Sequence, residues 1–122
     1  MEYIIDQYDY EDEGQALSAS ELTIQQLLKN AFDAGASDLH INVGTEPMMR
    51  LNGRLYKLVN QVLTDQDTRS MSEQVLNSKQ LEQLQKEGEV DFAFEIPGLS
   101  RYRGNVFKQR RHTNMAFRVL SS

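Results

Sequence analysis

From Glu89 to Leu120 the sequence is typical of three consecutive β-strands, and this feature most constrains how the chain can fold. Polar and apolar side chains alternate in 89–95, 101–109 and 113–120, which is the period of strands with one buried face. Pro97-Gly98 separates the first two runs and is typical of a turn. Strands joined by such short turns are antiparallel, so we expect an antiparallel sheet in this half of the chain.

Three more strands are expected in the first half. Residues 37–43 alternate in the same way and place Asp38 and His40 on one side of a strand. Asn52-Gly53 is among the dipeptides that most favour a tight hairpin turn. Strand-like runs lie on either side of it, at 48–51 and 54–58.

Helical spacing of apolar residues marks three segments. The first begins after Ser20, a good N-cap, and ends before Gly35. The second runs from Thr64 or Asp65 to about Leu76, and the third runs from a Ser78 cap to Glu87, where Gly88 stops it. The order α-βββ-αα-βββ predicts an α+β fold with a mainly antiparallel sheet of about six strands and helices packed on one face. The predicted core consists of Leu27, Leu28, Phe32, Leu39, Ile41, Val90, Phe92, Phe94, Val106, Phe117 and Val119.

Charge is divided unevenly along the chain. Residues 1–14 hold six acidic side chains and no Lys or Arg, whereas residues 100–122 hold six cationic side chains and no acid. Such asymmetry indicates a partner rather than a fold. The chain has no cysteine, which excludes disulfides and thiol chemistry. It has neither a long apolar run nor a basic leader followed by one, so we expect a cytoplasmic protein.

No motif for catalysis is visible. There is no G-x-x-x-x-G-K-[ST] phosphate loop and no G-x-G-x-x-G at a helix start. His40 and His112 are far apart in the sequence and lack the spacing of metal ligands, so no metal site is expected. No set of residues has the spacing of a catalytic triad or a carboxylate pair. We therefore expect no enzyme within this chain.

The basic segment that starts at Arg101 allows three interpretations. Its cations can form a solvated strand face, or they can bind nucleic acid with Tyr102 and Phe107 as stacking rings. They can also capture a nucleotide's phosphate through Arg103 and Arg118, because a guanidinium is always charged and bidentate. A sequence pI near 5.0 argues against nucleic acid. Charge pattern alone favours the solvated face.

A family resemblance favours the third interpretation, in which Arg103 and Arg118 capture a nucleotide's phosphate. Ala36-Ser-Asp-Leu-His40 after a capped helix, followed by Gly44-x-x-Pro47-Met-x-Arg50-x-x-Gly53, resembles the start of pilus retraction ATPases of the PilT type. The resemblance extends over residues 27–120. It continues through Asp91-Phe92-x-Phe94, Pro97-Gly98, Arg101-Tyr-Arg103-x-Asn105-x-Phe107-x-Gln109 and Ala116-Phe117-Arg118.

The resemblance implies a PAS-like N-terminal domain at 20–120, preceded by an acidic arm at 1–19. The C-terminal RecA-like ATPase domain, with its bound ATP and Mg, would lie outside this chain. The resemblance also implies a hexameric motor. In it the domain would pack on its own ATPase domain and on that of a neighbouring subunit, and it would transmit nucleotide-driven motion. The motor would work with the pilus machinery at the inner face of the membrane. By motif position, Arg103 and Arg118 would contact the nucleotide phosphates. The expected domain and subunit interface comprises Asp38, His40, Arg50, Arg101, Asn105 and Gln109.

Two departures from the family pattern stand out. Gly104 occupies a position where the family usually has Val, and the acidic arm is longer than is usual in retraction motors. The Gly44-x-x-Pro47 turn and the Arg101-Tyr-Arg103…Phe107-x-Gln109 strand look like the retraction pattern. A domain that starts near residue 20 is expected to leave no room for the additional N-terminal domain of extension motors, so retraction is favoured over extension or secretion. A stand-alone PAS-like module that binds a ligand or a signal is the alternative function.

Overall fold

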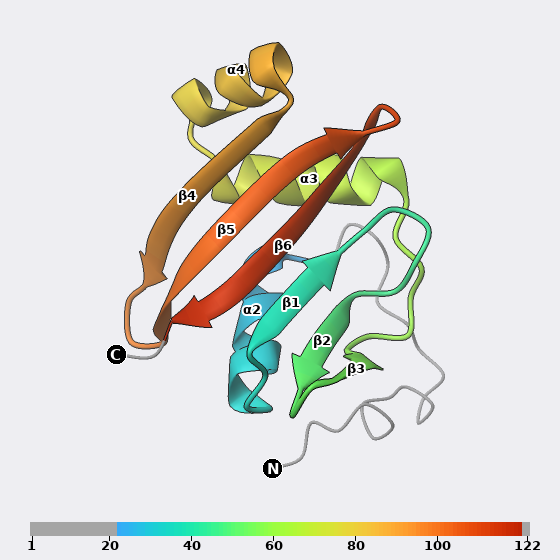
Figure 1. The fold of residues 1–122 in the computed structure, drawn as a ribbon, viewed down its shortest axis with the longest axis vertical. Coiled ribbons are helices and arrows are strands. Elements are labelled where there is room, and N and C mark those ends of the chain that lie inside the picture. Colours follow the sequence, from blue (N-terminus) through green and yellow to red (C-terminus); the bar gives the residue numbers. More distant parts are fainter. Residues whose placement is uncertain (1–21, 121–122) are drawn as a thin grey trace.

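The computed structural model describes residues 22–120, which form one six-stranded antiparallel sheet with three helices (Figure 1). The predicted fold class is therefore confirmed. The strand order is β3-β2-β1-β6-β5-β4, so the first and last strands lie next to each other. The elements, in chain order, are α2 (Ile24–Asp33), β1 (Asp38–Ile41), β2 (Met48–Leu51), β3 (Arg54–Lys57), α3 (Asp65–Val75), α4 (Ser78–Glu87), β4 (Glu89–Ile96), β5 (Ser100–Gln109) and β6 (His112–Leu120).

Local sequence sets the ends of the helices. Thr23 caps α2 and accepts a hydrogen bond from Gln26 N at 3.1 Å. The predicted cap Ser20 and the acidic arm lie outside the described residues. Thr64, one of the two caps expected for α3, is its N-cap and forms a capping box with Asp67. Asn77, and not the predicted Ser78, caps α4, because its side chain forms the reciprocal box with Gln80.

In Figure 1, α2 and α3 lie behind the sheet, and α4 lies beside the start of β4. The helix-covered side holds the core, in which Tyr102, Phe117, Leu39 and Ile41 are at most 2% exposed. Tyr102 stacks on Phe94 with ring centroids 5.3 Å apart, and its hydroxyl donates to Leu28 O in α2 at 3.4 Å. Burial is the main cause that raises the pKa of Tyr102 to about 12, and the Asp33 charge adds to it. The opposite face of the sheet carries no described helix.

Phe32 is not a core residue, although its helical spacing predicted one. It is 37% exposed, whereas Leu27 and Leu28 on the same helix are buried. Ile24, which flanks the predicted stripe, is buried as well. The buried face of α2 is therefore rotated away from Phe32, because the helix packs over β1 and toward α3, where Ile24 N donates to Gln74 Oε1 at 2.7 Å.

The exposure of Phe32 predicts a small effect on stability. We expect Phe32→Ala to lower the free energy of unfolding by about 1–2 kcal/mol, less than a core substitution, because the residue is already 37% exposed and its removal leaves no closed cavity. Phe117→Ala, at a site 2% exposed, should lower it by about 3–5 kcal/mol. Urea unfolding followed by circular dichroism measures both changes. Equal losses at the two positions would contradict the placement of α2.

Gly104 lets two aromatic rings approach the backbone of β5. A Cβ at this position would lie 2.9 Å from Phe92 Cζ and 3.0 Å from Phe117 Cε1. Both distances are shorter than ordinary van der Waals contact, so the rings fill the space that a side chain would need. The departure from the family pattern at this position thus has a packing reason.

We expect Gly104→Val to lower the free energy of unfolding by about 1–3 kcal/mol, because the added methyl groups overpack the core. Ala116→Val is the matched control, since Ala116 lies beside Asn105 in the same sheet but on the face opposite to the helices. Chemical denaturation of both variants provides the measurement. A Gly104→Val protein as stable as the parent would show that the rings are free to move.

Candidate functional site

Arg103 and Arg118 are direct neighbours across the β5–β6 ladder, where they form one cross-strand pair. Both side chains leave the sheet on the face opposite to the helices, and they are 65% and 70% exposed. Strand alternation puts them there, because Tyr102 and Phe117, which precede them in the two strands, point into the core. Two guanidinium groups far apart in the sequence therefore share one surface.

A carboxylate holds each arginine. Arg103 binds Asp91 through two contacts, Nη2 to Oδ2 at 3.0 Å and Nε to Oδ1 at 3.4 Å. Arg118 donates from Nε to Asp38 Oδ1 at 3.1 Å, and Asp38 also accepts from Ser37 Oγ at 2.7 Å. Exposed ion pairs of this kind add little to stability. They do restrict where the two guanidinium groups point.

Both arginines keep donors available for a ligand. A guanidinium has five N–H donors, and Arg118 uses only Nε toward the residues that the structure describes. Arg103 uses Nε and Nη2, which leaves Nη1 without a described partner. Each side chain therefore keeps N–H donors that an incoming anion can use without displacing its carboxylate.

The charges of the site shift three pKa values. Partial burial would raise the pKa of Asp38, but the hydrogen bonds from Ser37 and Arg118 outweigh burial and lower it. The hydrogen bond from Arg103 lowers the pKa of Asp91. Burial lowers the pKa of His40, the Asp38 charge opposes this change, and the Arg50 charge adds to it. The two carboxylates thus stay charged, and His40 tends toward its neutral form.

The remaining predicted interface residues lie on the same face. Asp38 pairs with Arg50 across β1 and β2, and the Arg50 side chain donates to Gly53 O at 3.1 Å. Asn105 donates to Glu89 Oε2 at 2.9 Å. The face collects every position predicted from the sequence: Asp38, His40, Arg50, Arg101, Arg103, Asn105, Gln109 and Arg118.

Asp91 is the site residue that sequence reasoning missed, although the family motif includes it. Alternation along β4 places Asp91 on the arginine face, and its sign is opposite to that of Arg103. The shared face and the opposite charge together could have identified Asp91 as a partner of Arg103 from the sequence. The pairing itself depends on the β4–β5 register, in which Asp91 lies opposite Asn105, one diagonal step from Arg103.

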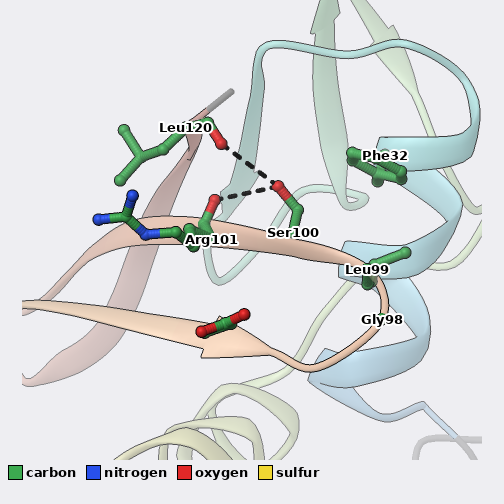
Figure 2. A pocket seen from close by; sticks show the side chains of 7 residues that line it. Phe32, Gly98, Leu99, Ser100, Arg101 and Leu120 are labelled. Carbon is green, nitrogen blue, oxygen red and sulfur yellow. Dashed lines mark hydrogen bonds between the residues drawn. The ribbon is translucent and has the colours of Figure 1, made fainter. Parts of the chain in front are cut away.

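A pocket of about 470 Å³ lies next to this face, at the turn between β4 and β5. Figure 2 shows Phe32 and Leu99 on one side of it and Arg101 and Leu120 on the other. Ser100 Oγ donates to the carbonyl oxygens of Arg101 and Leu120 at 3.2 and 3.4 Å, which ties the end of β6 to the turn. The exposed ring of Phe32 thus borders a partly apolar hollow.

Two further observations concern residues 22–120. They contain no group of three or more His, Cys, Asp or Glu side chains arranged to hold a metal ion. No helix in this part of the chain is long and apolar enough to cross a membrane.

Comparison with known proteins decides the family, although no family model matches the sequence. The type IV pilus retraction ATPase PilT of Pseudomonas aeruginosa is 34% identical over 101 residues, which cover 83% of this chain and 29% of that protein. The type IV pilus ATPase PilU of the same organism is 31% identical over 101 residues and is covered to 26% of its length.

The crystal structure of the pilus retraction motor PilT with bound ADP has the same fold, with a TM-score of 0.77 at 32% identity. The match covers 84% of this chain and 30% of the PilT chain in that structure. The chain belongs to the PilT family of pilus ATPases. It spans less than a third of the length of these relatives. The ATPase DotB of Legionella pneumophila, with a TM-score of 0.70 at 21% identity, shares the fold.

The ion pairs of this PilT-family domain predict how two carboxylates titrate. A group whose pKa is lowered by folding stabilises the fold above its ordinary pKa, and that stabilisation is lost as the pH falls through the folded value. We expect Asp38 and Asp91 to titrate below the ordinary range for aspartate. Side-chain carboxyl carbon shifts in NMR spectra, recorded against pH, measure both.

Two variants test whether each arginine lowers the pKa of its own carboxylate only. Arg118→Gln should raise the pKa of Asp38 and leave that of Asp91 unchanged, because partial burial of Asp38 is then less opposed. Arg103→Gln should raise the pKa of Asp91 alone. If both carboxylates shifted in both variants, the two ion pairs would be one coupled network and not two separate pairs.

Proposed function

We propose that the chain is the N-terminal domain of a hexameric pilus retraction motor, and that Arg103 and Arg118 reach toward the phosphates of ATP bound by a RecA-like ATPase domain. The observation that carries the proposal is the cross-strand pairing of these two arginines on the face without helices. A pair of rigid, permanently charged forks with free N–H donors fits a phosphate that develops negative charge during hydrolysis.

The rest of that face provides the surroundings that a domain interface needs. Asp38, Arg50, Asn105 and Arg101 offer both signs of charge and both donors and acceptors beside the two arginines. Phe32 and Leu120, at the adjacent pocket, add apolar surface. In this proposal the face packs on ATPase domains of its own and a neighbouring subunit, which hold ATP and Mg, and a rigid shift of the domain transmits the motion to the pilus machinery at the inner face of the membrane.

The alternative of a stand-alone module that binds a ligand or a signal has less support. The space between sheet and helices is filled by large side chains, including Tyr102 and Phe117, which are 0% and 2% exposed. The charged groups gather instead on the outer face of the sheet. That arrangement fits a surface that meets another protein domain.

The proposal is tested in the full-length parent protein. Arg103→Ala and Arg118→Ala should each lower the kcat for ATP hydrolysis tenfold or more, because each removes charge that stabilises the transition state. Arg→Lys should restore activity only partly, since the bidentate fork is lost. Thermal unfolding and sedimentation should show an intact fold and hexamer.

Arg101→Ala is the matched control. Arg101 lies in the same strand and on the same face, next to Arg103 by alternation, and its side chain has no ion pair among residues 22–120. We expect a milder effect on kcat at this position. Small and equal effects at all three arginines would overturn the phosphate role and leave a solvated strand face.

A further inference from the structure

The turn between β5 and β6 is made by two adjacent arginines in left-handed backbone conformation. Arg110 has φ 55° and Arg111 has φ 72°, and the flanking Gln109 and His112 form the last pair of the ladder. This is the two-residue hairpin loop that favours Asn-Gly, because side chains with a Cβ disfavour positive φ. The loop is therefore unfavourable for its backbone, so backbone preference alone does not account for arginine at both positions.

Another hairpin of the same chain has the residues that such a turn favours. The β2–β3 hairpin turns through Asn52 and Gly53, with φ 53° and 83°. The geometry of the two turns is alike, and only the residue types differ. The β5–β6 turn thus has residues less suited to its backbone conformation than Asn-Gly, and it places two exposed cations at its tip.

These cations have no acidic partner in the described part of the chain. No ion pair or side-chain hydrogen bond within residues 22–120 involves Lys108, Arg110 or Arg111. Two described carboxylates near this hairpin in the fold, one bound to His112 and one lining the pocket beside Lys108, have other partners. Asp65 binds Arg69 at 3.1 Å and His112 at 3.3 Å, and Glu89 accepts from Asn105 at 2.9 Å.

A surface pocket of about 440 Å³ begins beside the tip. Four residues of β5 line it, together with Gly88 and Glu89: Asn105, Phe107, Lys108 and Gln109. Phe107 is only partly buried, so its ring offers apolar contact next to the cations. The tip and this pocket together fit an acidic segment that also carries aromatic rings.

The chain itself contains such a segment. Residues 8–13 read Tyr-Asp-Tyr-Glu-Asp-Glu, and residues 1–14 as a whole carry six carboxylates and no Lys or Arg. We propose that residues 8–13 dock in cis on the basic tip formed by Lys108, Arg110 and Arg111, with a tyrosine ring against Phe107. The docking needs neither ATP nor a second domain, so it stands independently of the phosphate role of Arg103 and Arg118.

Reach and local concentration favour the cis arrangement. The 21 residues before Leu22 can span up to about 70 Å when extended, whereas a domain of this size has a radius of gyration of only about 13 Å. A tethered segment has an effective concentration in the millimolar range, which makes even a weak contact populated.

The arginine face of the sheet is a poorer partner for this segment. There Arg103 and Arg118 already have the carboxylates of Asp91 and Asp38 beside them, at 3.0 and 3.1 Å. An approaching acidic segment would meet those like charges. One carboxylate, Glu89, lines the pocket beside the tip, but Lys108, Arg110 and Arg111 have no described carboxylate partner, so more positive charge stays uncompensated there.

The experiment uses the full 122-residue chain, whose lack of cysteine permits a single spin label at Gln7→Cys. We expect the label to broaden the backbone amide signals of residues 107–112 several-fold more than those of the Asn52-Gly53 hairpin. The broadening should disappear in 1 M NaCl, where the Debye length falls to about 3 Å.

The variant Arg110→Asn with Arg111→Gly removes both charges and installs the sequence that the turn prefers. It should fold, unfold at a temperature equal to or above that of the parent, and lose the broadening. The matched control, Arg54→Asn with Lys79→Gln, removes two exposed cations that have no described ion pair elsewhere and should keep the broadening.

Several outcomes would overturn the proposal. Broadening that survives in the Arg110→Asn, Arg111→Gly variant, or that is strongest around Arg103 and Arg118, would place the segment elsewhere. Broadening seen only between labelled and isotope-enriched copies would show contact in trans. Binding of the chain to phosphatidylglycerol vesicles through the tip, together with no broadening in their absence, would assign the tip to a lipid surface.

Discussion

The pairing of β1 with β6 is the constraint on which the rest of the structure depends. The two strands lie far apart in the chain, yet they form the centre of the sheet and join the β1–β2–β3 half to the β4–β5–β6 half. Without this ladder each half would be a separate three-stranded meander, since Phe117 and Leu39 are neighbours only across this pairing. The same ladder places Arg118 opposite Asp38, so the central fold contact is also a contact of the candidate site.

The two faces of the sheet differ in role: one packs against the helices, and the other carries the charged groups of the candidate site. On the helix side, Phe92 and Phe117 approach Gly104 so closely that no side chain fits there. On the other side, the same strands present Arg103, Arg118 and their carboxylate partners to solvent. A strand has only two faces, so a rigid, filled core on one side fixes the spacing of the charged groups on the other. The site is thus positioned by packing and not by its own weak ion pairs.

One turn of this sheet has a backbone conformation that is unfavourable for its residues. Two hairpins of this sheet make the same kind of turn, one with Asn-Gly and one with Arg-Arg. Either choice closes the ladder, so the folding requirement alone does not select arginine. The basic tip and the arginine face are two charge features of the described residues, and the acidic run in residues 1–14 is a third one in the sequence.

Local sequence determined the type and order of the secondary structure in residues 22–120. Alternation in β4, β5 and β6, the Asn52-Gly53 turn, and the residue Thr64 that begins α3 act over a few neighbouring residues, so they are visible without a structure. The α+β class and the antiparallel sheet follow from that order. The face on which Arg103, Arg118 and Asp38 lie was also readable, because a side chain's face in a strand depends only on the period of two.

Tertiary structure decided what depends on contacts between distant segments. The sequence predicted Phe32 in the core, but the packing of α2 toward Gln74 of α3 turns that ring to the surface. The pairing of Arg103 with Asp91 and of Arg118 with Asp38 required the strand registers. Periodicity reports which side chains share a face of one element. Only the docking of that element on its neighbours decides how it is rotated and which partner each charge meets.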